Sequence, residues 1–159
     1  MTFPDQVPGS AEEFCGAYFE QLSKAAATVD RGRVAQAAAR LQAAYRSDAQ
    51  VFVCGNGGSA AIANQMVCDH LKSIRTGSTL KPRVISLVTT MELLTATAND
   101  QDYASVFELP LASLGRKDDV LVTISASGNS PNIVRAMEKT QTKQQTTNTH
   151  TRNNTPKTP

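Results

Sequence analysis

Residues 50–59 decide the fold class of this chain and read Gln50-Val51-Phe52-Val53-Cys54-Gly55-Asn56-Gly57-Gly58-Ser59. Residues 51–54 form a short, continuous apolar run, and the residues after them form a turn of glycine and small polar side chains. A buried parallel strand that ends in a glycine-rich turn has this pattern. Residues 60–73 then favour a helix, with Ile62, Met66 and His70 on one side.

The same succession of elements recurs along the chain. The later elements predicted from periodicity are strands 83–88 and 119–125 and helices 90–98, 102–115 and 131–139. Pro110 is expected to disturb the middle one of these helices, whereas Pro131 suits the first turn of the last one. Strands that alternate with helices predict an α/β fold with a doubly wound parallel sheet, in which ligands bind beyond the carboxyl ends of the strands.

Two helices are predicted before the first strand, at about 10–29 and 31–46. Ser10 is a suitable N-cap for the first helix, and Glu13 three residues later completes a capping box. Asp30 can cap the second helix. Both helices are rich in alanine, so we expect them to form a helical hairpin that packs closely on itself or on a second subunit.

The net charge of +2 over 159 residues conceals an uneven distribution. Residues 1–139 hold 13 basic and 14 acidic side chains, and residues 140–159 hold three basic and no acidic ones. The near-neutral body therefore gives no argument for binding to nucleic acid or to an anionic membrane. The length fits one domain.

Targeting features point to the cytoplasm. No window approaches the 18–20 apolar residues of a membrane span, and the first ten residues lack the basic and apolar regions of a secretory signal. Cys15, Cys54 and Cys68 are odd in number and form no CxxC pair. Reduced thiols in the cytoplasm are the simplest interpretation.

The two ends of the chain differ from the body. Residues 1–9 contain two prolines and a glycine and are expected to be a loose N-terminus. Residues 140–159 are rich in threonine and contain no Ala, Val, Ile, Leu, Met, Phe, Trp, Tyr or Cys, so they cannot bury enough apolar surface to offset the entropy of ordering. We therefore expect a domain at 10–139 and a disordered tail at 140–159.

Two loops carry the candidate chemistry. Residues 55–59 let a ligand approach the backbone closely at a helix N-terminus, although a tight turn without a ligand has the same composition. Residues 125–130, Ser-Ala-Ser-Gly-Asn-Ser, offer three hydroxyl groups beside another helix N-terminus. This composition favours an uncharged phosphate cradle over a simple capping loop, which needs only one serine.

Together, residues 54–59 and 125–130 resemble the two signature loops of the SIS (sugar isomerase) domain, a phosphosugar-binding module of flavodoxin-like fold. The helical hairpin and the pair Asn99-Asp100 make the phosphoheptose (sedoheptulose 7-phosphate) isomerase group the nearest one, over about residues 10–139. That group has five parallel strands in the order 2-1-3-4-5. The resemblance therefore implies a fold that is incomplete at its C-terminal side, with strand 119–125 as an apolar, aggregation-prone edge.

The resemblance also implies roles for particular residues. The implied contacts are to the sugar from Asn56, Gly57, Gly58 and Ser59, to substrate hydroxyls from Asn99 and Asp100, and to the phosphate from Ser125, Ala126, Ser127 and Ser130. Ala126 stands where the isomerases often have threonine. Six and ten residues beyond the loop serine, these isomerases carry a His and a Glu that act at the reaction centre and can bind zinc. Here those positions hold Gln65 and Asp69.

Because too few zinc ligands remain, we expect no metal site and no cofactor. Asp69 and His70 are the candidate catalytic residues: Asp69 stands at the position of the family's Glu, and His70 could move a proton near neutral pH. The alternative is structural: a packed Cys68 and a His70 that is hydrogen-bonded to a backbone carbonyl.

The leading hypothesis is a protein that binds a phosphosugar (a carbohydrate derivative) and resembles sedoheptulose 7-phosphate isomerase of heptose biosynthesis. If active, it would be an aldose–ketose isomerase of carbohydrate metabolism. The expected partners are a sugar phosphate and further copies of the chain, with a homotetramer as the usual family assembly, and neither nucleic acid nor a membrane. The alternatives are a non-catalytic interaction protein of the kind that binds the replication initiator, and an inactive truncated product.

Overall fold

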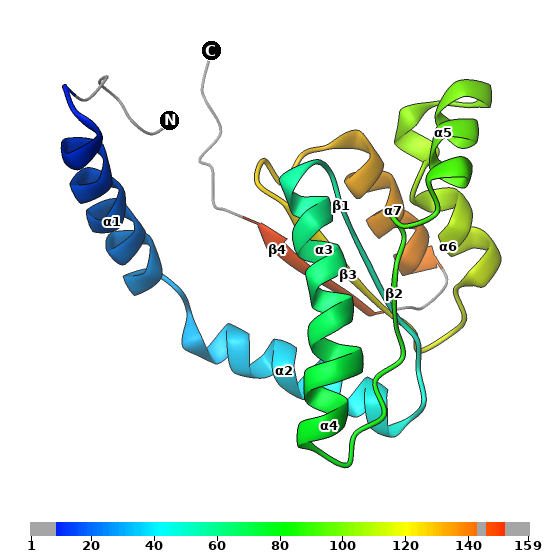
Figure 1. Ribbon diagram of the computed structural model, residues 1–159. Coiled ribbons are helices and arrows are strands. Elements are labelled where there is room, and N and C mark those ends of the chain that lie inside the picture. Colours follow the sequence, from blue (N-terminus) through cyan, green and yellow to red (C-terminus); the bar gives the residue numbers. More distant parts are fainter. Residues whose placement is uncertain (1–8, 143–145, 152–159) are drawn as a thin grey trace. The chain divides into compact units, whose positions relative to one another are not determined.

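The computed structural model describes residues 9–142 and 146–151 (Figure 1). The elements follow in the order α1 (Ala11–Ala27), α2 (Arg31–Arg46), β1 (Val51–Gly55), α3 (Gly58–Cys68), the π-helix η1 (Asp69–Ile74), α4 (Arg75–Gly77), β2 (Val84–Ser86), α5 (Met91–Asp100), the 3₁₀ helix η2 (Tyr103–Ser105), α6 (Glu108–Leu114), β3 (Val120–Ser125), α7 (Pro131–Thr142) and β4 (Thr146–Thr151). The chain divides into two compact units at residues 36 and 37, within α2, and each unit is described by itself.

The first unit contains α1 and the beginning of α2. Ser10 caps α1, because its hydroxyl accepts a hydrogen bond from the Glu13 N–H at 3.1 Å, and the Glu13 carboxylate accepts one from the Gly9 N–H at 2.9 Å. Asp30 accepts from the N–H groups of Gly32 and Arg33 at the start of α2. Both predicted helices are confirmed, and their packing as a hairpin stays a prediction.

The second unit is built on a parallel sheet with the strand order β2-β1-β3-β4. Every residue of the central strand β1 is buried, as its continuous apolar run predicts. Phe52 and Cys54 face one hydrophobic cluster with α6 and α7, while Val51 and Val53 face another with α2 and α3. Figure 1 shows α3 on one face of the sheet and α6 and α7 on the other. The predicted doubly wound α/β class is confirmed.

Two helical segments differ from their predicted form. The predicted helix 102–115 is two helices, η2 and α6, and the Asp102 side chain caps the start of η2 by accepting from the Ser105 N–H at 2.7 Å. Pro110 then lies in the first turn of α6, where its missing N–H costs little. The helix predicted at 60–73 extends from Gly58 through η1 and α4 to Gly77.

The C-terminal side also differs from the sequence-based expectation. Residues 140–142 complete α7, and Thr146–Thr151 form β4, which pairs in parallel with β3 over its whole length. β3 is therefore not the edge strand, and the division into a domain at 10–139 and a tail at 140–159 stays a prediction. A backbone ladder needs no apolar side chains, and β-branched threonine suits an extended backbone. The N-terminal residues 1–8 and the tail residues 143–145 and 152–159 lie outside the described part.

Candidate functional site

The two signature loops leave the sheet next to each other. Gly55 of β1 is the register partner of Ile124 of β3, so the loops 56–57 and 126–130 begin at the same edge, at the carboxyl ends of neighbouring strands. Each loop leads directly into a helix, α3 or α7. The topology thus brings two helix N-termini together at the edge where parallel sheets bind ligands.

The first loop depends on glycine at two positions. Gly57 has φ of +53°, a conformation that side chains other than glycine rarely adopt. At Gly55, an added Cβ would lie 2.7 Å from the backbone oxygen of Ser59. Backbone bonds from Ser59 N–H to Asn56 and from Ala60 N–H to Gly57 close the turn at 2.9 and 3.0 Å. The backbone of this loop is therefore exposed and tightly turned.

The second loop brings its serine hydroxyls into a row. The Ser125 and Ser127 oxygens lie 3.4 Å apart, and those of Ser127 and Ser130 lie 3.5 Å apart. Ser125 also accepts from the Gly128 N–H at 3.1 Å, which holds the loop against the end of β3. Gly128 has φ of +70°, and Ala126 is exposed. Three hydroxyls that converge beside a helix N-terminus are suited to an oxyanion such as a phosphate.

Sequence reasoning missed two residues that join the loops. The side-chain amides of Asn56 and Asn132 donate to each other, at 2.9 Å from Asn56 and 2.8 Å from Asn132. The Tyr103 hydroxyl also donates to the Asn56 amide oxygen at 3.1 Å. Because these contacts link segments 47 and 76 residues apart, no local pattern of a single sequence predicts them.

Asn99 and Asp100 lie at the C-terminal end of α5. The Asn99 amide donates to the Asp100 carboxylate at 2.8 Å, and both side chains are exposed. Their bond does not join them to either loop. The nearby residue that does reach the glycine loop is Tyr103.

Asp69 and His70 lie far from the loops within one chain. Gly58 begins α3, and Asp69 follows at the end of its eleven residues, so a rise of 1.5 Å per residue places them about 16 Å apart. Asp69 accepts a hydrogen bond from Gln65 at 2.8 Å. His70 Nδ1 is hydrogen-bonded to the hydroxyl of buried Tyr45, instead of the backbone carbonyl considered above.

Burial shifts the pKa values of three side chains in this unit: His70, Tyr45 and Cys54. It lowers the pKa of His70, an effect that the carboxylate of Asp69 partly opposes. Burial raises the pKa of Tyr45 well above its usual value. At β1, burial raises the pKa of the Cys54 thiol to about 12, so this residue stays protonated and is a poor nucleophile.

The side chains present do not fit a zinc ion. Gln65 and Asp69 offer one amide and one carboxylate, which bind each other on an exposed helix face. A structural or catalytic zinc needs three or four strong ligands. In the part of the chain that the structure describes, no three His, Cys, Asp or Glu side chains lie together in a way that could hold a metal.

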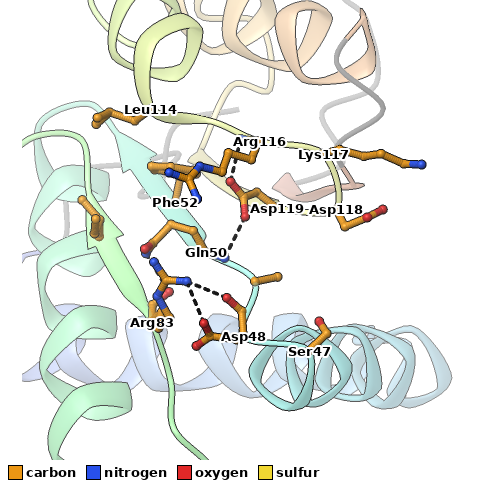
Figure 2. Close-up of a pocket in the computed structure, with 12 residues that line it drawn as sticks. Ser47, Asp48, Gln50, Phe52, Arg83, Leu114, Arg116, Lys117, Asp118 and Asp119 are labelled. Atoms are coloured by element: carbon orange, nitrogen blue, oxygen red, sulfur yellow. Dashed lines mark hydrogen bonds and ion pairs between the residues drawn. The ribbon is translucent and has the colours of Figure 1, made fainter.

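A cavity of about 490 Å³ lies at the opposite edge of the sheet, near the amino ends of the strands (Figure 2). Arg83 donates there to the Asp48 backbone and carboxylate oxygens, at 2.6 and 3.2 Å. Buried Asp119 accepts from the backbone N–H groups of Gln50 and Arg116, at 2.8 and 2.7 Å. These bonds join the segments before β1, β2 and β3, and the residues that line the cavity do not include those of the two loops.

Comparisons with known proteins identify the family. The sequence model of the SIS domain matches residues 14–148, and the chain belongs to the SIS domain family. Within that family it is phosphoheptose isomerase-like. It is 40% identical over 103 residues to the phosphoheptose isomerase of Desulfovibrio desulfuricans, covering 65% of this chain and 49% of the relative. For that of Bordetella avium the identity is 43% over 98 residues, covering 62% and 49%.

Solved structures agree with this assignment. A phosphoheptose isomerase from Francisella tularensis superimposes with a TM-score of 0.82 at 28% identity, covering 89% of this chain and 75% of the other. Phosphoheptose isomerase GmhA from Neisseria gonorrhoeae gives 0.77 at 32% identity, covering 89% and 76%. The chain spans about half the length of the curated relatives it matches. In the described part, no helix is long and apolar enough to cross a membrane.

Proposed function

We propose that this chain binds a phosphosugar at the carboxyl edge of its sheet. The observation that carries the proposal is the row of hydroxyls from Ser125, Ser127 and Ser130 beside the N-terminus of α7. These groups would hold the phosphate without a cationic side chain. The neighbouring glycine loop would then receive the sugar.

The remaining contacts are those that the resemblance to the phosphoheptose isomerase group implies. Gly57, Gly58 and Ser59 would contact the sugar through an open backbone, and the backbone of Ala126 would border the phosphate. Asn99 and Asp100 would reach sugar hydroxyls at the exposed end of α5. The names of the relatives support a heptose phosphate as ligand, and we propose sedoheptulose 7-phosphate, an intermediate of heptose biosynthesis.

Isomerisation would move a proton between C1 and C2 of the sugar through an enediol. A base would remove the proton from one carbon and return it to the other, while an acid would protonate the carbonyl oxygen and the neighbouring hydroxyl would lose its proton. Asp69 is the candidate base and His70 its candidate partner. Because both lie about 16 Å along the helix from the glycine loop, they would act on a sugar bound by another copy of the chain. Catalysis would then require the homo-oligomer, and a homotetramer is the assembly that we propose.

A non-catalytic interaction protein is the second candidate. Two contacts favour it: His70 is bound by Tyr45, and Asp69 is bound by Gln65. An isomerase assay of the full chain, followed by the aldose product, separates the two functions. Turnover that is lost in Asp69→Asn supports isomerisation. Ligand binding without turnover favours the interaction protein.

We place either function in the cytoplasm, since Cys15, Cys54 and Cys68 are free thiols.

Calorimetry of the full chain tests the binding proposal, with sedoheptulose 7-phosphate, sedoheptulose and inorganic phosphate as ligands. We expect saturable binding of the sugar phosphate, no binding of the unphosphorylated sugar, and a loss of about tenfold in Ser127→Ala or Ser130→Ala. Ser113→Ala removes a comparable exposed hydroxyl on α6 and should bind normally. Absence of binding at millimolar sugar phosphate would refute the proposal.

A further inference from the structure

The side chain of Asn56 has three polar contacts, and all of them face the protein. Its amide oxygen accepts from Asn132 at 2.8 Å and from the Tyr103 hydroxyl at 3.1 Å, and its amide nitrogen donates to Asn132 at 2.9 Å. An asparagine held by two donors and one acceptor has one orientation, since a flipped amide would lose all three bonds. Asn56 is therefore fixed before any ligand arrives.

Asn132 is a buried amide with an exposed fraction of 1%, in the first turn of α7. A buried amide without partners is costly, so the position requires the reciprocal pair with Asn56. Asn132 is two residues from Ser130, whose hydroxyl closes the row in the serine loop. The pair therefore connects the glycine loop to the helix that carries the serine loop.

The segment that carries Tyr103 is bonded to the same helix, α7. Its neighbour Asp102 accepts two bonds from Arg135 of α7, at 3.0 and 3.1 Å, and Arg135 also donates to Ser105 at 2.6 Å. These bonds tie η2 to α7. Tyr103 and Asn132 thus reach Asn56 from two elements that are themselves joined.

We propose that Asn132 and Tyr103 are positioning residues that act through Asn56 and set the glycine loop at a fixed distance from the serine loop. The spacing selects a ligand that reaches both loops, so these residues favour a phosphorylated sugar over free phosphate. This inference rests on the proposed phosphosugar binding. It gives Asn56 the role of holding the loop backbone in place.

Binding measurements on the full chain test the proposal with two probes, sedoheptulose 7-phosphate and inorganic phosphate. Tyr103→Phe removes only the hydroxyl and should weaken sugar phosphate binding by about threefold to tenfold, with phosphate binding within about twofold. Asn132→Asp replaces a donor by a charged acceptor that faces the Asn56 oxygen. This change should weaken sugar phosphate binding by more than about tenfold. The double variant Tyr103→Phe/Asn132→Asp should bind the sugar phosphate as weakly as Asn132→Asp alone, because both residues act through Asn56.

Two exposed controls match these changes: Tyr18→Phe removes a hydroxyl on α1, and Gln42→Glu converts an amide to a carboxylate on α2. Both should bind as the unmodified chain does. Equal losses for the two probes would show a merely structural role and overturn the proposal. Unchanged sugar phosphate binding in Tyr103→Phe would also overturn it, even if Asn132→Asp fails to fold.

Hydrogen exchange of the ligand-free chain separates this inference from the proposed function. The N–H groups of Ser59, Ala60 and Ala61 bond within the glycine loop, and they should exchange faster in Tyr103→Phe. Unchanged exchange overturns the positioning role whether or not a sugar phosphate binds. Suppose instead that exchange is faster in Tyr103→Phe but that the unmodified chain binds no sugar phosphate. This result refutes the phosphosugar function and the ligand selection, while the positioning contact between Tyr103 and Asn56 stands.

Discussion

Gly55 shows how a single residue can control the geometry of the site. A methyl group at this position would lie 2.7 Å from a backbone oxygen of Ser59, which cannot move without opening the turn into α3. Gly55→Ala should therefore lower the free energy of unfolding by about 1–3 kcal/mol, as overpacking does. It should also weaken sugar phosphate binding.

Urea unfolding followed by circular dichroism measures this effect. Gly77→Ala is the control, because an added Cβ at Gly77 meets no atom within 4 Å. The control should leave stability unchanged or raise it slightly, since alanine suits a helix better than glycine. Equal stability in Gly55→Ala and Gly77→Ala would contradict the close approach.

His70 makes a second residue-scale prediction, on pH. Burial beside Tyr45 lowers the pKa of His70 below the value of 6.5 that an exposed histidine has, and Asp69 only partly offsets this. The unfolded chain therefore takes up the proton at a higher pH than the folded chain. Stability should be complete above about pH 6.5 and should decrease as the pH falls from there through the lower pKa of the folded state.

Urea midpoints at pH 7.5 and 5.5 provide the measurement. In His70→Asn, whose oxygen can still accept from Tyr45, the difference between the two midpoints should shrink. His150→Gln changes the other histidine and should keep the difference. A difference that survives in His70→Asn would assign the pH dependence to other groups.

At the scale of elements, the protection of β3 depends on β4. Leu121 and Val122 of β3 are the register partners of Thr147 and Asn148. In a parallel ladder, neighbouring N–H groups alternate in direction, so one of these two faces β3. Thr147→Pro/Asn148→Pro should therefore remove a ladder bond, cost about 1–3 kcal/mol and expose an apolar strand edge.

Light scattering at increasing protein concentration tests this expectation. The double proline variant should aggregate at lower concentration than the unmodified chain. Thr147→Ser/Asn148→Ser keeps both N–H groups and should remain as soluble as the unmodified chain. If the proline variant is equally soluble, β4 does not protect β3.

Element boundaries were predictable where the signal is local. The continuous apolar run predicted β1, the capping residues Ser10 and Asp30 predicted the starts of α1 and α2, and Pro131 is the first residue of α7. The division between η2 and α6 was not predicted, because the Asp102 carboxylate that caps the start of η2 is held partly by Arg135, 33 residues later. β4 was missed because its polar composition gives no apolar signal and its pairing partner is a distant strand.

At the scale of the whole molecule, α1 predicts self-association. None of its residues is buried, and the exposed fractions of Tyr18, Phe19 and Leu22 are 47, 65 and 52%. Burial of the exposed half of each such side chain against a second copy would contribute about 1 kcal/mol. Phe19→Glu/Leu22→Glu should therefore shift the chain toward the monomer and abolish any isomerase activity that depends on assembly.

Sedimentation velocity over a range of concentrations measures the assembly. Gln21→Glu adds a charge to an exposed position of the same helix and should leave the assembly intact. A monomer for the unmodified chain at all concentrations would contradict self-association. An oligomer that persists in Phe19→Glu/Leu22→Glu would place the interface elsewhere.

The α/β class and the two loops follow from short stretches of sequence, because a strand period, a glycine turn and a serine cluster are local patterns. The phosphosugar hypothesis follows from the resemblance of those two loops to the SIS domain. Tertiary structure alone decided how Asn56, Tyr103 and Asn132 meet, since residues far apart in sequence become neighbours only when β1 and β3 pair. It also separated Asp69 and His70 from the glycine loop, because the eleven residues of α3 place the two ends of this helix about 16 Å apart. Local patterns identify which groups can act, and the packing of the elements determines which of them can act together.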